Sequence, residues 1–226
     1  MVAIRTDEVW KSYGVNTLRQ VDAVRNVSVI VEEGAVTAFG GPSGSGKTTL
    51  LSLIGLLTRP SKGKVFLGDH EVSQFSEVYR TKMRREEIGF VFQAQYLLPQ
   101  LTAVENVALP KICTNVSRDD AEDLARIRLI DVGLEQRLDF KVAELSGGEL
   151  QRVSIARSLM NSPRILIADE PSSSIDEALT KEVLATLKKM VEDDRLTVVV
   201  ASHDPIVLNW AEVRYMMRDG EIINEK

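Results

Sequence analysis

The hydrophobic positions of this 226-residue chain switch repeatedly between a strand-like period of two and a helical period of three to four. Short runs rich in β-branched residues predict strands at Val2 to Trp10, Val21 to Val31, Ala35 to Phe39, Lys64 to Leu67, Ile88 to Gln93, Ile165 to Ala168 and Thr197 to Ala201. Helical periodicity predicts helices at Lys47 to Leu57, Glu77 to Glu87, 102 to 135, Gly147 to Met160 and Glu177 to Val191. The pair Asp219-Gly220 predicts a closing hairpin.

This alternation predicts an α/β fold with a mainly parallel central sheet. The run from Thr197 to Ala201 is almost wholly β-branched, as expected of a parallel strand that is covered on both faces. Ser117 and Asp120 fit the pattern of a capping box inside the predicted helix 102 to 135. Four apolar residues of that segment recur on one face at helical spacing: Leu124, Ile127, Ile130 and Leu134.

The composition is ordinary for a soluble globular protein, with 27% charged and 44% apolar residues. Lys and Arg number 28 against 33 Asp and Glu, without a dense basic cluster, which disfavours nucleic acid as the main partner. The single cysteine, Cys113, cannot form an internal disulfide and fits a reducing compartment. The N-terminus lacks a signal-peptide pattern, and no apolar run reaches about 18 residues. We therefore expect a cytoplasmic protein that serves a membrane only through another chain.

Residues 41 to 48 fit the phosphate-loop pattern G-x-x-x-x-G-K-[ST], between a predicted strand and a predicted helix. Its glycines let successive backbone N–H groups converge on phosphate oxygens. Lys47 is placed to reach the β- and γ-phosphates, and the Thr48 hydroxyl suits Mg²⁺. We expect the nucleotide to be bound by Gly41, Pro42, Ser43, Gly44, Ser45, Gly46, Lys47, Thr48 and Thr49. The loop by itself does not separate a kinase, a GTPase and a transport ATPase.

The apolar strand that begins at Ile165 ends in two carboxylates, Asp169 and Glu170. Neither could stay charged inside a sheet, so the strand must deliver both to a site or to solvent. Asp169 is expected to hold Mg²⁺ and Glu170 to act as the general base that activates water. The alternative is a strand that simply ends at the surface.

Residues 145 to 152 read LSGGELQR and open a predicted helix. Ser146 with Glu149 is a capping box, which any helix can have, but a helix N-terminus also binds anions. Capping does not explain the double glycine or the Gln-Arg pair that follows.

The phosphate loop together with LSGGELQR resembles the nucleotide-binding domain of ATP-binding-cassette (ABC) ATPases over nearly the whole chain. The resemblance implies a P-loop NTPase core formed by about residues 1 to 90 and 161 to 226, with an N-terminal antiparallel β subdomain. Residues 91 to 160 would form an α-helical signature subdomain. It also implies a homodimer around two ATP and two Mg²⁺, driving a separate integral membrane permease from the cytoplasmic face.

The resemblance further assigns roles to single residues. Ser146, Gly147 and Gly148, with Glu149 beside them, would contact the γ-phosphate of ATP held by the second copy, and Asp176 would make a further contact across the dimer. Gln93 would reach Mg²⁺ and the attacking water, and His203 would bind the γ-phosphate. Tyr13 would stack on adenine. On their own, Gln93 and His203 read as ordinary strand-end residues, and Tyr13 could simply pack against Trp10.

Two segments depart from the family pattern. Gly40 stands where an aliphatic residue is more usual, and Ser172-Ser173-Ser174-Ile175-Asp176 replaces a commoner S-A-L-D ending. The segments 84 to 93 and 97 to 110 are especially similar to lipoprotein-releasing, macrolide-efflux and cell-division ATPases. In that subgroup Tyr96, Leu97 and Leu98 would line a groove for the permease; core packing is the alternative.

Three other functions remain open at this point. A translation or DNA-repair ABC protein usually has two cassettes or an inserted coiled coil, which this chain lacks. A small-molecule kinase or GTPase would not need LSGGELQR. A regulator of cell division or envelope remodelling, which transports nothing, shares every motif described above.

Overall fold

The computed structural model describes residues 1–15, 20–114, 116–173 and 175–225 and contains two sheets. The first is antiparallel, in the order β2-β1-β4-β5, and consists of β1 (Val2–Tyr13), β2 (Val21–Glu32), β4 (Lys62–Leu67) and β5 (His70–Glu71). The second has the order β10-β9-β3-β8-β7-β6. Its strands are β3 (Val36–Gly40), β6 (Ile88–Val91), β7 (Ile165–Asp169), β8 (Thr197–Ala201), β9 (Val213–Arg218) and β10 (Glu221–Glu225).

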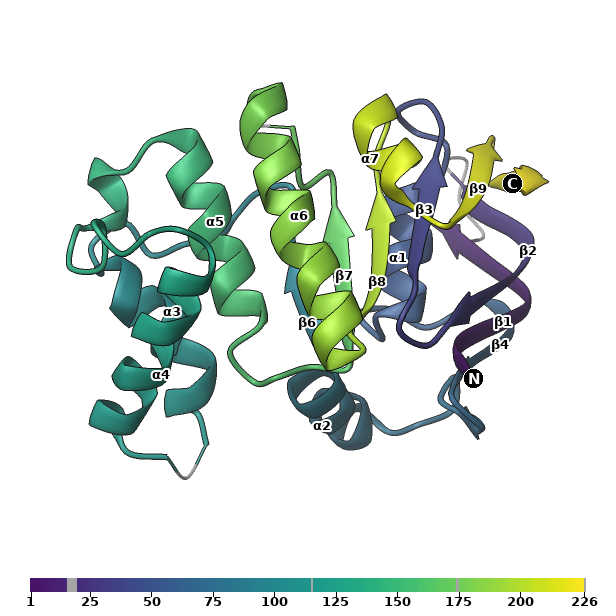
Figure 1. Ribbon diagram of the computed structural model, residues 1–226. Helices are drawn as coiled ribbons and strands as arrows, with labels where there is room; N and C mark the ends of the chain where they lie inside the picture. Colours follow the sequence, from purple (N-terminus) through teal and green to yellow (C-terminus); the bar gives the residue numbers. More distant parts are fainter. Residues whose placement is uncertain (16–19, 115, 174, 226) are drawn as a thin grey trace.

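All strands of the second sheet run parallel except β10, which pairs antiparallel with β9 through the predicted hairpin at Asp219-Gly220. The predicted α/β class with a mainly parallel sheet is confirmed. The strands β3, β7 and β8 therefore end on one edge of the sheet, at the top of Figure 1. In such sheets ligands bind outside the carboxyl ends of the strands, so this edge is where a site is expected.

Helices cover both faces of the parallel sheet. These are α1 (Lys47–Ile54), α2 (Glu77–Glu87), α3 (Ala103–Ile112), α4 (Arg118–Asp131), α5 (Gly147–Ser158), α6 (Glu177–Asp194) and α7 (Pro205–Trp210), with a 3₁₀ turn at Val142–Glu144. Helix α1 packs between the two sheets, whereas α6 and α7 lie on the other face of the parallel sheet (Figure 1). Helices α3, α4 and α5 gather at one end of the molecule. The division of the chain at residues 90 and 161 stays a prediction.

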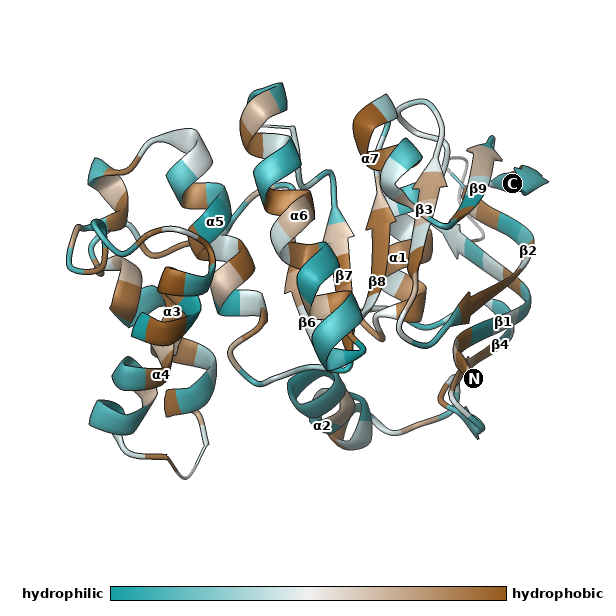
Figure 2. Ribbon diagram, viewed as in Figure 1, coloured by the Kyte–Doolittle hydropathy of each residue, from teal (hydrophilic) through white to brown (hydrophobic). Residues whose placement is uncertain are grey.

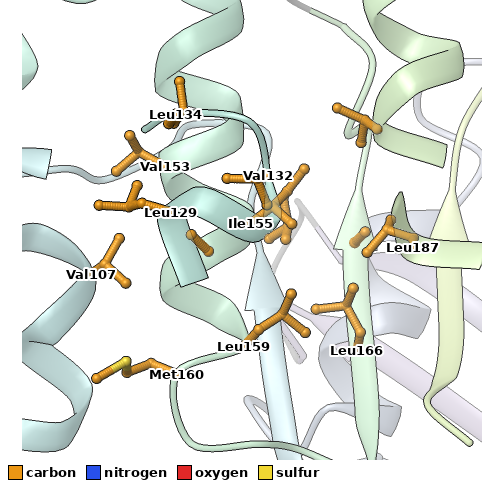
Figure 3. Close-up of a cluster of buried hydrophobic side chains, with 14 of the residues drawn as sticks. Val107, Leu129, Val132, Leu134, Val153, Ile155, Leu159, Met160, Leu166 and Leu187 are labelled. Atoms are coloured by element: carbon orange, nitrogen blue, oxygen red, sulfur yellow. The ribbon is translucent and has the colours of Figure 1, made fainter. Parts of the chain in front are cut away.

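Two apolar clusters hold these layers together. One fills the space between the antiparallel sheet, α1 and one face of the parallel sheet, where Phe39 stacks on Tyr215 with ring centroids 5.5 Å apart. The other joins the opposite face to α3–α6 through side chains such as Leu129, Ile155 and Leu187 (Figure 3). The central strands β3, β7 and β8 are thus buried on both faces, and β7 and β8 are mostly brown, the hydrophobic colour, in Figure 2.

Residues 102 to 135, which were predicted to be helical, form two separate helices. Helix α3 ends at Ile112 and α4 begins after Ser117, whose hydroxyl accepts a hydrogen bond from the backbone N–H of Asp120. Of the four apolar residues predicted to share a face, only Leu134, which lies beyond the end of α4, is buried; Leu124, Ile127 and Ile130 are exposed. The buried face of α4 lies roughly opposite and consists of Ala121, Ala125 and Leu129. Two small alanines let α3 and α4 approach closely, which hydrophobicity alone does not predict.

Candidate functional site

The phosphate loop leaves the end of β3 and enters α1 directly, as predicted. Gly41, Gly44 and Gly46 have φ angles of 138°, 78° and 103°, which L side chains rarely adopt. At Gly46 a Cβ would also lie 2.3 Å from the carbonyl oxygen of Ala23. Glycine at that position is therefore required both by the backbone angle and by the neighbouring strand. The loop is a cradle for an anion at the N-terminus of α1.

Lys47 closes this loop. Its side chain is only 7% exposed, and its Nζ donates to the carbonyl oxygens of Gly41, at 2.8 Å, and Pro42, at 3.0 Å. The hydroxyl of Ser45 is buried and has no hydrogen-bond partner among the residues that the structure describes. A buried unpaired hydroxyl costs stability, so its presence inside a cradle of backbone N–H groups fits a ligand with many acceptor oxygens. A nucleotide phosphate chain is such a ligand.

Gly40 has a local explanation for its departure from the family pattern. A Cβ there would lie 2.6 Å from Sδ of Met216 and 3.1 Å from a methyl group of Leu208. Strand β9 and helix α7 occupy the space that an aliphatic side chain would need.

Asp169 ends β7 next to the loop. Burial raises the pKa of its carboxyl, and the nearby charge of Glu170 raises it further, whereas a hydrogen bond from Thr48 and the charge of Lys47 lower it. Within the described part of the chain, its Oδ1 has no hydrogen-bond partner. A partly buried carboxylate with a free oxygen beside a threonine hydroxyl is a donor set that suits Mg²⁺. Thr48 and Asp169 therefore fit the predicted metal site.

Glu170 adopts a φ of 50°, a left-handed conformation that is costly for a residue other than glycine. Its backbone N–H bonds to the carbonyl oxygen of Ala201 at 2.9 Å. Its carboxylate, in a side chain only 12% exposed, accepts from the hydroxyl of Ser202 at 3.3 Å and lies 3.0 Å from Nδ1 of His203. The carboxylate of Glu170, at the end of β7, therefore meets Ser202 and His203, which follow the end of β8. Sequence reasoning missed Ser202, whose only signal is its place before His203.

Gln93 lies just beyond β6, in an exposed loop, because the strand ends at Val91 and not at Gln93 as predicted. The same loop is fastened to α5. Arg157 donates to the carbonyl oxygen of Tyr96 at 2.8 Å and to that of Gln95. Gln95 also donates to Gln151 at 3.3 Å. Burial lowers the pKa of Arg157. Hydrogen bonds thus attach the loop that carries Gln93 to α5, a connection for which the sequence held no signal.

Tyr96, which has a φ of 47°, and Leu98 are exposed, whereas Leu97 packs against the core. Core packing, the alternative for all three residues, therefore holds only for Leu97.

The LSGGELQR segment caps α5 as expected. Ser146 and Glu149 form a capping box, in which the backbone N–H and the hydroxyl of Ser146 donate to Oε2 of Glu149, both at 2.8 Å. Arg137 donates to the other oxygen, Oε1, at 2.6 Å. The backbone N–H of Ser146 and Arg137 together lower the pKa of Glu149 to about 2.

Gly148 has a role that capping does not explain. A Cβ on it would lie 2.3 Å from Cδ2 of Leu179 in α6. Asp176 caps that helix, since its Oδ1 accepts from the backbone N–H of Leu179 at 2.9 Å. The start of α5 is therefore packed against the start of α6, and Ser146 and Gly147 remain exposed. Ser174, part of the unusual segment 172–176, lies outside the described residues.

The predicted residues thus fall into three groups. The phosphate loop, Asp169, Glu170 and His203 share the carboxyl edge of the parallel sheet, with Gln93 at the end of the neighbouring strand. Ser146 to Glu149 lie at the start of α5, with α6 between them and the phosphate loop in Figure 1. Tyr13 is 47% exposed at the end of β1, in contact with Lys11, whose Nζ is 5.2 Å from the ring centroid.

A cleft of about 960 Å³ opens at the opposite edge of the sheet, between β4–β5, α2 and the ends of α5 and α6. None of its lining residues belongs to the predicted site. The predicted site residues therefore do not line this cleft. No helix among the described ranges is both long and apolar enough to cross a membrane.

Known proteins resemble this chain over almost its full length. A family model described as ABC transporter matches residues 24–173. The chain is 39% identical over 216 residues to the lipoprotein-releasing system ATP-binding protein LolD of Geobacter metallireducens, covering 96% of each protein. It is 42% identical over 217 residues to the macrolide export ATP-binding/permease protein MacB of Bdellovibrio bacteriovorus, covering 96% of this chain and 33% of that longer protein.

Solved structures of ABC transporter cassettes are also similar to this chain. The dimeric structure of the bacterial ABC transporter cassette MJ0796 matches with a TM-score of 0.93 at 38% identity, covering 99% of this chain and 97% of the other. A dimeric post-hydrolysis state of the same cassette, bound to ADP and Pi, also matches with a TM-score of 0.93, at 37% identity and the same coverage.

Proposed function

This chain belongs to the ABC transporter family, and we propose that it is the ATPase subunit of a membrane complex in which two copies sandwich two Mg-ATP head to tail. One observation carries the proposal. The phosphate loop and the acidic pair share one edge of the sheet, whereas the exposed N-terminus of α5 lies apart from them along the molecule (Figure 1). A second copy in the opposite orientation would bring Ser146 to the phosphate loop of the first.

Nucleotide binding would use the loop between β3 and α1. The backbone N–H groups of the loop would bind the phosphate chain, and Lys47 would exchange its two carbonyl acceptors for β- and γ-phosphate oxygens. Thr48 and Asp169 would hold Mg²⁺, with Gln93 completing the set, and the bound ion supplies charge neutralisation at the transferring phosphoryl group. Tyr13 would stack on the adenine.

Hydrolysis would depend on Glu170. Its carboxylate would accept a proton from the attacking water, as a general base. Ser202 and His203 hold that carboxylate in place, and His203, which is 71% exposed, also has a free ring face toward solvent. Because the strained φ of Glu170 aims the carboxylate away from β7, Asp169 and Glu170 can serve different tasks from adjacent positions.

Closure of the dimer would depend on the γ-phosphate. Ser146, Gly147 and Gly148, with Asp176 nearby, would contact the ATP held by the opposite copy, so ATP would join the two copies and phosphate loss would release them. The matching cassette MJ0796 is a dimer, and a post-hydrolysis state of it holds ADP and Pi.

The membrane partner is inferred from the relatives. LolD is the ATP-binding protein of a lipoprotein-releasing system, and in MacB an ATP-binding part and a permease share one chain. The present chain would pair with a separate integral membrane subunit of this kind, at the cytoplasmic face of the membrane. The exposed Tyr96 and Leu98, in the loop fastened to α5, are placed to meet that subunit.

Two measurements test this function. Glu170→Gln is expected to bind ATP, to form a stable dimer in analytical ultracentrifugation, and to hydrolyse almost no ATP. Turnover close to that of the unchanged protein would remove Glu170 as the base. Affinity purification of the native complex is expected to recover an integral membrane subunit with a permease-like domain. Recovery of only a cell-division or envelope-remodelling complex would favour a regulatory role without transport.

A further inference from the structure

Glu149 places a negative charge at the N-terminus of α5, where the proposed dimer needs to receive a phosphate. Its Oε2 accepts from both the backbone N–H and the hydroxyl of Ser146, each at 2.8 Å. As a cap this is favourable, because a carboxylate stabilises the positive end of a helix. For phosphate binding the same carboxylate is unfavourable, because its negative charge repels the negatively charged phosphate.

The hydroxyl of Ser146 presents a second conflict. It donates its only proton to Glu149 and accepts, at 3.4 Å, from the backbone N–H of the same residue. To donate to a phosphate oxygen, this hydroxyl must release the carboxylate. A carboxylate whose charge is drawn toward another donor is a weaker competitor for that proton.

Arg137 is that donor. Its Nε lies 2.6 Å from Oε1 of Glu149, and its guanidinium lies 4.8 Å from the ring centroid of Phe140. The backbone N–H of Arg137 bonds to the carbonyl oxygen of Leu134 at 2.9 Å, in the turn that follows α4. The side chain of Arg137 therefore contacts both Phe140 and Glu149. Its positive charge lies beside the carboxylate of Glu149, whose side chain is only 17% exposed.

We propose that Arg137 neutralises Glu149 so that the Ser146 end of α5 can receive the γ-phosphate of ATP bound by a second copy. Arg137 is thus a positioning residue for the hydrolytic site of the opposite copy. This inference rests on the proposed head-to-tail dimer. It predicts that the need for Arg137 disappears when Glu149 loses its charge, which a purely structural role for the arginine would not produce.

The test uses the full chain in a Glu170→Gln background, where hydrolysis does not disturb the equilibrium. Analytical ultracentrifugation with increasing Mg-ATP gives the concentration at which half of the protein is dimeric. Arg137→Gln is expected to raise this concentration by about three- to fivefold, the size expected for a partly exposed charge pair. Fluorescent-nucleotide binding to dilute monomer should be unchanged, because the phosphate loop is intact.

The decisive variant is Arg137→Gln combined with Glu149→Gln. A glutamine keeps the capping box but carries no charge, so dimer formation should return to within about twofold of the Glu170→Gln parent. Arg137→Lys, which keeps the charge, should lose much less than Arg137→Gln. Arg126→Gln removes a comparable cation, paired with Asp139 at 3.0 Å on the same group of helices, and should have no effect.

The outcomes separate the two proposals. If Glu170→Gln binds Mg-ATP and never dimerises, the proposed dimer fails and this inference fails with it. If the Glu170→Gln protein dimerises, and adding Arg137→Gln leaves the Mg-ATP concentration for half-dimerisation unchanged, only the proposal about Arg137 is overturned. It is also overturned if the double substitution stays as weak as Arg137→Gln while both variants keep the melting temperature of the parent.

Discussion

The Nδ1 atom of His203 lies 3.0 Å from both carboxylate oxygens of Glu170, which joins the ends of two neighbouring strands, β7 and β8. The resemblance implied that His203 binds the γ-phosphate. The geometry adds that it also orients the carboxylate that is proposed to activate water. The imidazole therefore contacts the proposed base through Nδ1, and Nε2 is the nitrogen that would meet a phosphate oxygen.

His203→Ala is expected to lower the kcat of ATP hydrolysis about 100-fold, because a misoriented base transfers a proton poorly. The affinity of the monomer for ATP should change little, since the phosphate loop holds the nucleotide. Steady-state kinetics with a separate ATP-binding measurement would check this. A raised KM at unchanged kcat would instead mean that His203 binds nucleotide equally in the ground and transition states.

Asp169→Asn is expected to stabilise the protein in the absence of nucleotide and metal. Burial raises the pKa of Asp169, so the folded state holds this proton more tightly than the unfolded chain. The ionised carboxylate therefore subtracts stability at neutral pH, and this loss fades as pH falls through the raised pKa. Because the group is only partly buried, we expect a gain in melting temperature of roughly 2 °C.

The same variant should lose Mg²⁺-dependent hydrolysis. Calorimetry without ligand and an activity assay with Mg-ATP would check both halves of this prediction. A lower melting temperature in the absence of ligand would contradict the destabilising effect assigned to the buried charge of Asp169. For the unchanged protein, Mg²⁺ affinity should fall as the pH is lowered through the raised pKa of Asp169, because protons compete for the same oxygen.

Gly148→Ala is expected to destabilise the protein by about 1–3 kcal/mol, because the new Cβ meets Leu179 at 2.3 Å. Leu179→Ala in the same chain removes the obstacle and should restore part of that stability. ATP-dependent dimer formation is expected to recover along with stability in the double variant, because alanine keeps the backbone N–H that has the proposed phosphate contact. Chemical denaturation and ultracentrifugation would measure the two properties separately. Dimer formation that stays impaired at restored stability would mean that the added methyl group itself disturbs the proposed phosphate site.

Arg157→Gln is expected to release the loop that carries Gln93. The carbonyl oxygens of Gln95 and Tyr96 lose a charged donor, which should cost about 1–3 kcal/mol of stability. If Gln93 serves the proposed metal site, the Mg²⁺ concentration needed for half-maximal hydrolysis should rise, because its loop is no longer attached to α5. Arg157→Lys replaces the guanidinium, which donates to both carbonyl oxygens, with a single ammonium group. It should change the stability and the Mg²⁺ dependence less than Arg157→Gln does. An unchanged Mg²⁺ dependence would contradict this coupling.

The sequence predicted the phosphate loop almost residue by residue because its chemistry is local. Gly41, Gly44 and Gly46 are required by backbone angles, and Lys47 and Thr48 follow at a fixed spacing on the first turn of a helix. Asp169 and Glu170 were predictable for the same reason, since both stand at the end of a single buried strand. Their roles in binding and hydrolysis stay predictions until the variants are measured.

The hydrophobic pattern along the chain predicted the buried face of helix α4 less well than it predicted the strands. In α4 the most hydrophobic face is exposed, and two alanines with a leucine make the contact. Close helix packing depends on how near two backbones can come, which depends on the residues of both helices. A hydrophobic pattern within one segment does not contain that information.

The amino-acid sequence by itself determined the fold class, the phosphate loop, the acidic pair and the capping box at Ser146, because each follows from neighbouring residues. Only the tertiary structure decided that His203 contacts Glu170, that Arg157 fastens the loop of Gln93 to α5, and that Arg137 pairs with Glu149. Each of these contacts joins different segments of the chain across the fold. Such contacts depend on where the sheet and the helices bring distant side chains, and no local pattern encodes that placement.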